Sequence, residues 1–196
     1  MFRALRALSI SLIVVAFVAG SALAFKAPEI KLDAVDPILV QEFFVKPRLG
    51  YKSEQEPGKE APFGSTMLAA LIFDINNPNK TPVMLDEMQF VVNFDGIPVN
   101  TAMAKERMWI PGGKSNQLRV TFALDAFGVA TSLALSAANV QLLESKGIKP
   151  AEIIKKWWTT LPEAGFPVTL TQGQALFKDE KGKEVTAIFQ AAWPKK

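Results

Sequence analysis

The feature that most constrains the fold of this chain is a strict alternation of apolar and polar residues over positions 117–124. The apolar members are Leu118, Val120, Phe122 and Leu124, and the polar ones between them include Gln117, Arg119 and Thr121. A period of two places every second side chain on the same face of a β-strand. The pattern therefore predicts a strand with one buried and one solvated face, as antiparallel sheets have.

Other segments predict further strands of this kind. Residues 28–35 and 38–45 predict two pieces near the N-terminus. Residues 67–75 are apolar at nearly every position and predict a central strand covered on both faces. Residues 83–94 and 105–110 predict two more strands. In the first of these, the side chains on the inner face are Met88, Phe90, Val92 and Phe94.

Turn signals separate the predicted strands. The sequence Asn77-Pro78-Asn79 stops the strand over 67–75, because Asn side chains bond to local backbone and Pro removes a donor. Asp95-Gly96 predicts a two-residue hairpin turn, in which both central residues need positive φ. Pro111-Gly112-Gly113 precedes the alternating strand. We interpret the asparagines as a tight turn, with a polar ligand site as the alternative.

Two segments predict helices. Residues 126–143 are rich in Ala, Leu and Ser and lack Pro, and Gly147 follows as a stop signal. A second helix begins at Pro150, a residue well suited to a first helical turn. Its apolar stripe consists of Ile153, Ile154, Trp157 and Trp158. We expect this stripe to pack on its own domain; docking on a membrane interface is the alternative, with Trp157 and Trp158 as candidate binding residues.

These elements predict a mainly β protein. The fold expected is an immunoglobulin- or fibronectin-III-like antiparallel β-sandwich, with a two-helix insertion over 126–159 before a C-terminal hairpin. The hairpin comprises residues 166–177 and 184–193. Residues 25–196 are expected to form one domain, in which the Lys-, Glu-, Gly- and Pro-rich residues 46–65 form an exposed loop.

The N-terminus predicts an export signal. Arg3 and Arg6 precede an apolar run, and Ala22-Leu23-Ala24 fits a small-x-small cleavage site. We expect residues 1–24 to be a signal peptide. An uncleaved anchor is the alternative, because a loose apolar stretch over 7–25 nearly reaches the length that spans a bilayer. Either form predicts an exported protein, periplasmic or associated with the cell envelope.

The chain contains no Cys and no His. This excludes thiol nucleophiles, metal sites built on Cys or His, Ser-His-Asp triads and histidine proton shuttles. The carboxylates Asp74, Asp86, Glu87 and Asp95 form no recognisable acid–base pair by spacing. The sequence therefore predicts a protein that is not an enzyme, without catalytic residues, metal site or cofactor.

The charge balance gives no sign of nucleic-acid binding. Without residues 1–24 the chain keeps all 19 acidic residues and loses Arg3 and Arg6 from its 22 basic ones, so the net charge is +1. No cluster of Lys and Arg with interleaved aromatic residues is present in the body of the chain. We therefore expect no nucleic-acid partner.

The order of these strands and turns resembles the water-stress and hypersensitive-response (WHy) domain of the late embryogenesis abundant (LEA) group 2 family. The resemblance covers roughly residues 28–124, with the C-terminal hairpin as a final piece. Its most specific elements are Asn77-Pro78-Asn79, then residues 82–85, Asp95-Gly96 with residues 97–99, and Pro111-Gly112-Gly113. The resemblance implies a folded sandwich, exported or membrane-tethered and linked to water stress. The loop 46–65 and the insertion 126–159 exceed the minimal pattern of the family.

The resemblance, the export signal and the missing catalytic residues together predict a stress-protection protein. It would be exported and non-catalytic, and would shield client proteins or membrane lipids during water loss. One alternative is a lipid-binding or apolar-ligand module that uses a groove beside the helices. Another is an adaptor at the cell envelope, which would bind a partner through Trp157 and Trp158 or through a sheet edge.

Overall fold

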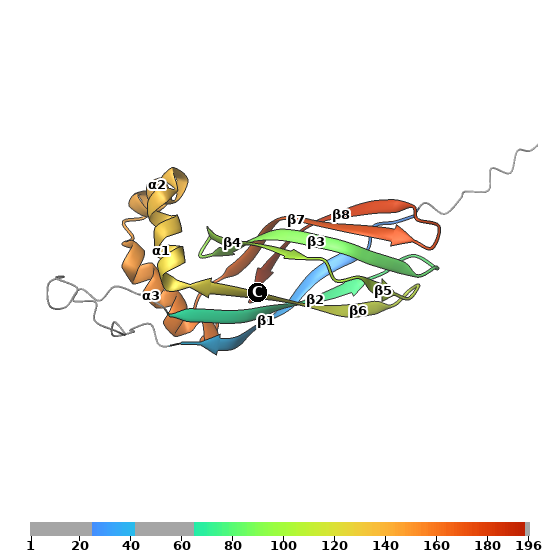
Figure 1. Cartoon of the computed structure of the whole chain (residues 1–196), viewed down its shortest axis with the longest axis horizontal. Helices are drawn as coiled ribbons and strands as arrows, with labels where there is room; N and C mark the ends of the chain where they lie inside the picture. The colour runs from blue at the N-terminus through green and yellow to red at the C-terminus, as the bar shows by residue number, and fades with distance from the viewer. Residues whose placement is uncertain (1–24, 42–64, 195–196) are drawn as a thin grey trace, which may run out of the picture.

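The computed structural model describes residues 25–41 and 65–194. The predicted signal peptide, 1–24, and the predicted loop 46–65 apart from Ser65 lie outside this part of the chain. Within it, strands alternate with turns until residue 125, and the helices then follow (Figure 1). The strands are β1 Glu29–Val40, β2 Thr66–Asn76, β3 Val83–Phe94, β4 Ile97–Ala104, β5 Met108–Ile110, β6 Ser115–Asp125, β7 Val168–Asp179 and β8 Glu184–Trp193.

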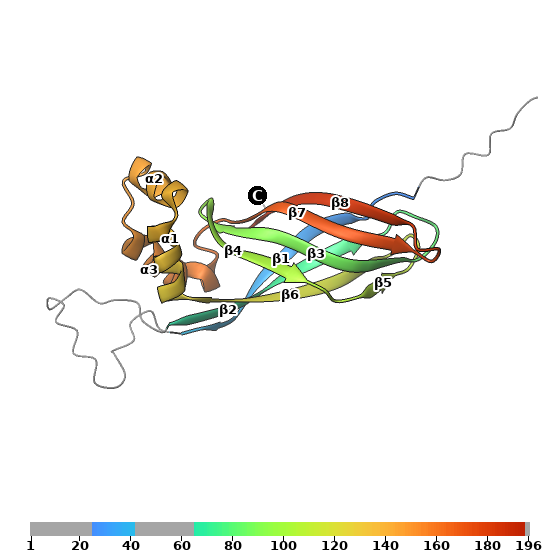
Figure 2. The same cartoon turned by 45° about the horizontal axis from the view of Figure 1, so that its top comes forward.

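The strands form two antiparallel sheets that pack face to face (Figures 1 and 2). One sheet has the order β1-β2-β6; the other has the order β4-β3-β7-β8, with β5 also paired to β3. The predicted β-sandwich is therefore confirmed. A constant-type immunoglobulin domain places its fourth strand in the first sheet. Here β4 lies in the second sheet beside β3, so the strand order departs from that of a constant-type domain.

The core between the sheets comes from the residues that alternation placed inward. All four predicted inner residues of β3 and all four of β6 are buried. Aromatic rings fill the middle of the sandwich: the ring centroids of Phe73 and Phe90 lie 5.3 Å apart, and Phe189 lies 6.0 Å from Phe73 and 6.1 Å from Phe90. Such tilted and edge-on pairs stabilise a core beyond simple area burial.

Two strand predictions need correction. The segments 28–35 and 38–45 were expected as separate pieces, but β1 is one strand that runs through Pro37. Its pairing with β2 shifts register on both sides of Val35, and an edge strand tolerates such bulges and a missing proline N–H. β2 was expected to be covered on both faces, yet Leu68 and Ile72 on its outer face are only half-buried.

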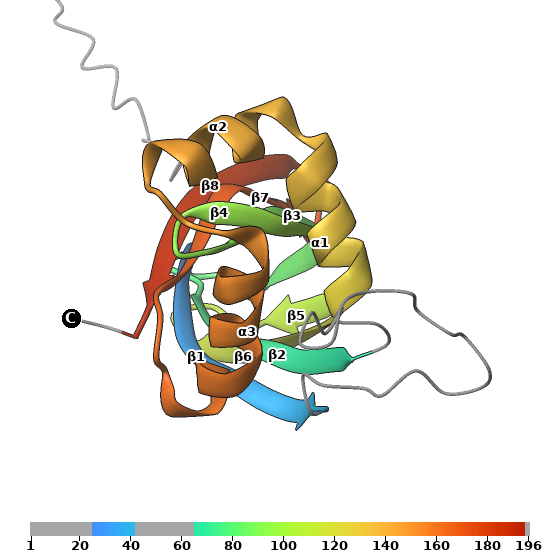
Figure 3. The same ribbon diagram turned by 90° about the vertical axis from the view of Figure 1, so that its left-hand side faces the viewer.

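The helices lie together at one end of the sandwich (Figure 3). They are α1 Ala126–Leu135, α2 Ala137–Ser145 and α3 Pro150–Thr160, followed by the short 3-10 helix η1 Leu161–Glu163. The single helix predicted over 126–143 is wrong, because the chain bends by 89° between α1 and α2. Ser136 causes the break: its extended backbone ends α1, and its side chain accepts a hydrogen bond from the Asn139 N–H that caps α2.

The predicted stop at Gly147 is confirmed and follows a recognised pattern. Gly147 has φ +63° and donates its N–H to Glu144 O, while the Ile148 N–H donates to Leu143 O. This pair of bonds is a Schellman motif, which satisfies the last carbonyl groups of a helix. The turn returns the chain to α3, which begins at Pro150 as expected.

Candidate functional site

The turn at Asn77-Pro78-Asn79 and the turn at Pro111-Gly112-Gly113 meet at the end of the sandwich opposite the helices (Figure 1). Asn77 is fully buried there. Its Nδ2 donates to the carbonyl oxygens of Thr81 at 2.9 Å and Ile110 at 3.1 Å, with Pro111 O at 3.3 Å. Its Oδ1 accepts from the backbone N–H of Asn79 at 3.0 Å and from Asn79 Nδ2 at 2.9 Å. We call residues 77–81 and 110–114 the Asn77 clamp.

Backbone contacts close the clamp further. Gly113 donates its N–H to Asn77 O at 3.0 Å and Asn79 O at 2.8 Å, and Asn77 donates to Lys114 O at 2.9 Å. Gly112 lies so close to the other turn that a Cβ there would clash with the backbone of Lys80. Gly112 is thus required for this close approach, and Gly113 for its φ of +65°.

The clamp also holds the beginning of the described chain. Asn79 Oδ1 accepts from the Lys26 N–H at 2.9 Å, and Asn79 Nδ2 donates to Lys26 O at 2.8 Å. The side-chain amides of Asn77 and Asn79 are therefore engaged with other parts of the chain. This geometry fits the predicted tight turn, and it leaves the Asn77 amide facing no solvent from which a polar ligand could reach it.

Asp95 and Gly96 lie at the other end, beside the helices. Their φ values of +51° and +79° match the predicted hairpin turn. The Asp95 side chain has a second use that the sequence did not reveal. Its Oδ2 accepts from Lys156 Nζ at 2.8 Å and from Trp157 Nε1 at 2.9 Å. One carboxylate thus ties α3 to the turn between β3 and β4.

The candidate binding residues Trp157 and Trp158 lie in the core, with exposed fractions of 0% and 2%. The Trp157 ring packs edge-on against Phe94 at 5.5 Å and tilted against Phe166 at 6.3 Å. The stripe on α3 therefore packs on its own domain, as expected. Neither ring is available at the surface for the alternative, in which they would dock on a membrane or a partner.

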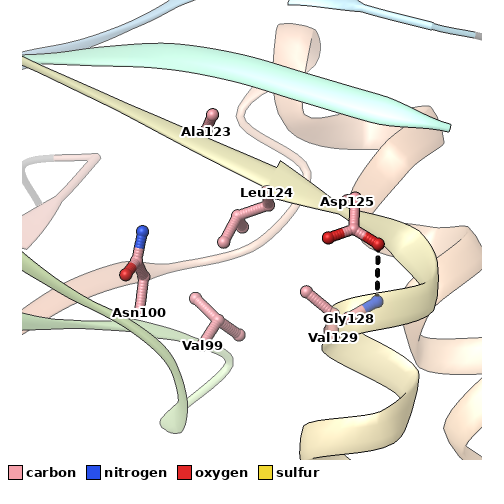
Figure 4. A pocket seen from close by; sticks show the side chains of 7 residues that line it. All are labelled: Val99, Asn100, Ala123, Leu124, Asp125, Gly128 and Val129. Atoms are coloured by element: carbon pink, nitrogen blue, oxygen red, sulfur yellow. Dashed lines mark hydrogen bonds between the residues drawn. The ribbon is translucent and has the colours of Figure 1, made fainter. Parts of the chain in front are cut away.

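Two hollows lie beside the helices. The larger has a volume of about 340 Å³ and is lined by Asp95, Lys146, Ile148, Glu152, Ile153 and Lys156. The smaller, of about 190 Å³, lies between β4, β6 and α1 (Figure 4). Its Asp125 accepts the Gly128 N–H at 2.6 Å and so caps α1. The larger hollow reaches the lower end of the size range of small-molecule pockets.

The carboxylates considered for acid–base chemistry are not brought together. Asp86 pairs with Arg107 at 3.0 Å and with Lys178 at 2.8 Å, and Asp95 is held by α3 at the other end. The hydrogen bond from Lys178 lowers the pKa of Asp86, and the bond to Asp86 raises the pKa of Lys178. In the described ranges no group of three or more Asp or Glu side chains could hold a metal ion.

The most unusual surface belongs to α1 and α2. From Ala126 to Leu143 the chain contains no charged residue. The outer side of these helices exposes Leu135 to 81% and Phe127 to 51%, together with Ala134, Ala137 and Ala138. We call residues 126–143 the elbow. In the described part of the chain no single helix is long and apolar enough to cross a membrane; α1 and α2 meet those criteria only jointly, across their bend.

Sequence reasoning gave Trp157 and Trp158 as candidate binding residues only in the alternative interpretation, and it named no residue of the elbow, although a signal for this segment was present. A helix at the surface of a protein usually carries charged residues on its outer side. Eighteen consecutive uncharged residues were therefore evidence that the outer side of this segment is also uncharged. The tryptophans drew attention instead, because their size suggests binding as readily as core packing.

Comparison with known proteins adds little to this description. No protein-family model matches the chain, and no curated protein matches it. Several solved structures are similar over most of its length, at low identity.

A protein from Archaeoglobus fulgidus is 8% identical with a TM-score of 0.36, covering 85% of this chain and 98% of its own. A candidate ApaA protein from Bordetella pertussis is 12% identical with a TM-score of 0.39, covering 87% and 98%. A candidate late embryogenesis abundant protein is 10% identical with a TM-score of 0.30, covering 90% and 73%. At these values the likenesses carry no argument about function.

Proposed function

We propose that this chain is an exported, non-catalytic protection protein of the LEA group 2 (WHy) type. It would contact partly unfolded proteins or membranes during water loss. The observation that carries the proposal is the elbow, an uncharged segment that exposes Phe127 and Leu135 on an otherwise well-packed sandwich. Exposed apolar surface of this kind commonly marks a place of interaction. The turn motifs that resemble the family support the assignment from the sequence.

The mechanism is weak and broad contact. As water is removed, client proteins expose apolar surface that would otherwise join with that of other clients. Leu135 and the neighbouring alanines offer such a client an uncharged surface without a shaped pocket. Contacts of this type need no single indispensable residue, and they reverse when water returns.

A drying assay tests the proposal. A labile reporter enzyme is dried with the full chain, with an equal mass of albumin, or with the Leu135→Lys variant, and its activity is measured after rehydration. We expect protection above albumin for the full chain and a partial loss of it for Leu135→Lys, because the charge interrupts the elbow but leaves the rest of its surface in place. Thr121→Lys places the same charge at an exposed position on β6 and serves as the matched control. Protection no better than albumin would reject the proposal.

A second candidate function, a lipid-binding or apolar-ligand module, has one observation in its favour. The 340 Å³ hollow beside Asp95 combines Ile148 and Ile153 with the amines of Lys146 and Lys156. The carboxylates of Asp95 and Glu152 also line the hollow and balance the two amines, and Lys156 is already bonded to Asp95, so the lining suits a molecule with an apolar part and an uncharged polar group. Native mass spectrometry of the chain purified from its host envelope would reveal a bound lipid. The same mass shows whether the chain is cleaved after Ala24, as export predicts. Clean apo protein that takes up no added lipid would reject this candidate.

A further inference from the structure

The strand β8 forms one edge of the larger sheet. In the described residues it pairs with β7 only. β1 of the other sheet passes close to it and pairs with β2 instead. Every second N–H and C=O group of β8 therefore points away from the sheet without a ladder partner in this part of the chain. An edge of this kind is a template for pairing with another strand.

The other edge strands carry features that discourage such pairing. β1 contains Asp36 and Pro37 and two shifts of register, and β4 has Pro98 near its start. β6 carries the charged Arg119 in its middle. Prolines, charges and bulges are the usual means by which edges avoid association. β8 contains neither a proline nor a charged residue between residues 185 and 193, and Ile188 in its middle is 72% exposed.

We propose that β8 pairs with β8 of a second copy of this chain, antiparallel and about a two-fold axis through Ile188. In one strand, only alternate residues direct their backbone groups to the free edge. Two residues that lie opposite each other must then both have odd numbers or both have even numbers. The two-fold axis therefore lies between the two copies of one residue, which here is Ile188. The pairing joins the two larger sheets into one continuous sheet, with an isologous interface.

The side chains of β8 suit this register. Ile188 would face its own copy, while Thr186 would face Gln190 of the second copy on the same surface of the sheet. On the inner surface Ala187 would face Phe189. The charged Glu184 would lie opposite Ala192, so that no like charges meet. This self-complementarity favours a second copy over an unrelated peptide as the occupant of the edge.

The absence of cysteine from the chain allows a direct test. Ile188→Cys is introduced into the full chain in its host, and the cells are treated with a mild thiol oxidant. Opposed residues in an antiparallel pair have Cα atoms about 4.5–5.5 Å apart, within the range of a disulfide. Thr186→Cys is the matched control. In the proposed register the two copies of position 186 lie four residues apart, roughly 13 Å, which is too far.

We expect a disulfide-linked species of twice the chain mass from Ile188→Cys and not from Thr186→Cys. A charge exchange provides the second measurement. Ile188→Lys and Ile188→Glu should each be monomeric alone and should associate when mixed, because the two positions face each other. Absence of the linked species, equal linkage in both cysteine variants, or linkage to a different protein would overturn the proposal. Failure of these tests would leave the drying assay of the elbow unaffected, so the two proposals are separable.

Discussion

The two ends of this sandwich are built by different means. At the Asn77 clamp, polar side-chain and backbone atoms of two turns bond to one another, and glycines allow the backbones to approach. At the helical end, aromatic packing around Trp157 and one carboxylate of Asp95 hold the helices in place. The clamp uses its polar groups internally, whereas the helical end exposes the uncharged elbow.

This difference separates the residues that specify the fold from those that face outward. The turns that carry the resemblance lie mostly in the clamp, where Asn77, Asn79 and the two glycines each have a structural reason. The segment that exceeds the family pattern forms the elbow. A sequence motif can therefore identify an architecture while the surface that we propose to contact partners lies in an insertion.

The largest effect is expected at the helical end. Trp157→Ala removes a fully buried indole that packs on Phe94 and Phe166, and should lower the free energy of unfolding by about 3–5 kcal/mol. Denaturant unfolding measures the change. Trp109→Ala is the control, because that side chain is half-exposed, and should change stability by less than about 0.5 kcal/mol. Equal losses in both variants would show that burying Trp157 adds no more to the free energy of unfolding than the half-exposed Trp109 does.

A smaller but substantial effect is expected at the clamp. Asn77→Ala leaves the carbonyl groups of Thr81 and Ile110 without their side-chain donor and should cost about 2–3 kcal/mol. Thermal and denaturant unfolding give the value. Asn76→Ala, at an exposed asparagine that ends β2, serves as the control and should be nearly neutral. A neutral Asn77→Ala would mean that the clamp does not hold the two turns together.

Asp95 has two roles, one in the hairpin turn and one in the bonds to Lys156 and Trp157 of α3. Asp95→Asn keeps a residue that tolerates positive φ, so the turn should persist. It weakens the bonds to Lys156 and Trp157, and we expect a loss of about 1–2 kcal/mol. Hydrogen exchange should become faster in α3 while β3 and β4 stay protected. Faster exchange in β3 and β4 as well would assign the carboxylate to the turn instead.

The smallest effect belongs to the ion pair of Asp86 and Lys178. The pKa of Asp86 is lowered from its ordinary value of 3.8, so its contribution to stability is present above that value and is lost as the pH falls through the folded pKa. The pKa of Lys178 is raised from 10.5, so its contribution is lost only as the pH rises beyond that value. The stability difference between the wild type and Asp86→Asn should therefore be constant from about pH 5 to 9 and shrink in acid. A difference that grows in acid would contradict this.

The sequence predicted the layers of the fold well and its connections less well. Alternation in β3 and β6 identified the inner residues, because a period of two leaves little choice of face. The bend at Ser136 was missed, since Ala and Leu on both sides favour helix and a single serine is a weak break signal. The continuity of β1 through Pro37 depended on its being an edge strand, which is a property of the assembled sheet.

The candidate sites show the same limit. Asn77, Pro78 and Asn79 were interpreted as a turn, and local side-chain bonding is a property that a sequence reveals. The bonds from Asn77 to Ile110 and from Asp95 to Trp157 join residues 33 and 62 positions apart. No local sequence pattern predicts contacts between residues so far apart. The exposure of the elbow likewise follows from where the helices pack, and the uncharged run was its only sign in the sequence.

Photo-crosslinking during drying tests whether the elbow is the surface that contacts client proteins. A photoreactive side chain is placed at Leu135 in the elbow or at the exposed Lys80 in the clamp, and each chain is dried with the reporter enzyme under illumination. We expect crosslinks to the reporter from position 135 and few from position 80. Equal yields from both positions, or higher yields from the clamp, would contradict the assignment of the elbow as the contact surface.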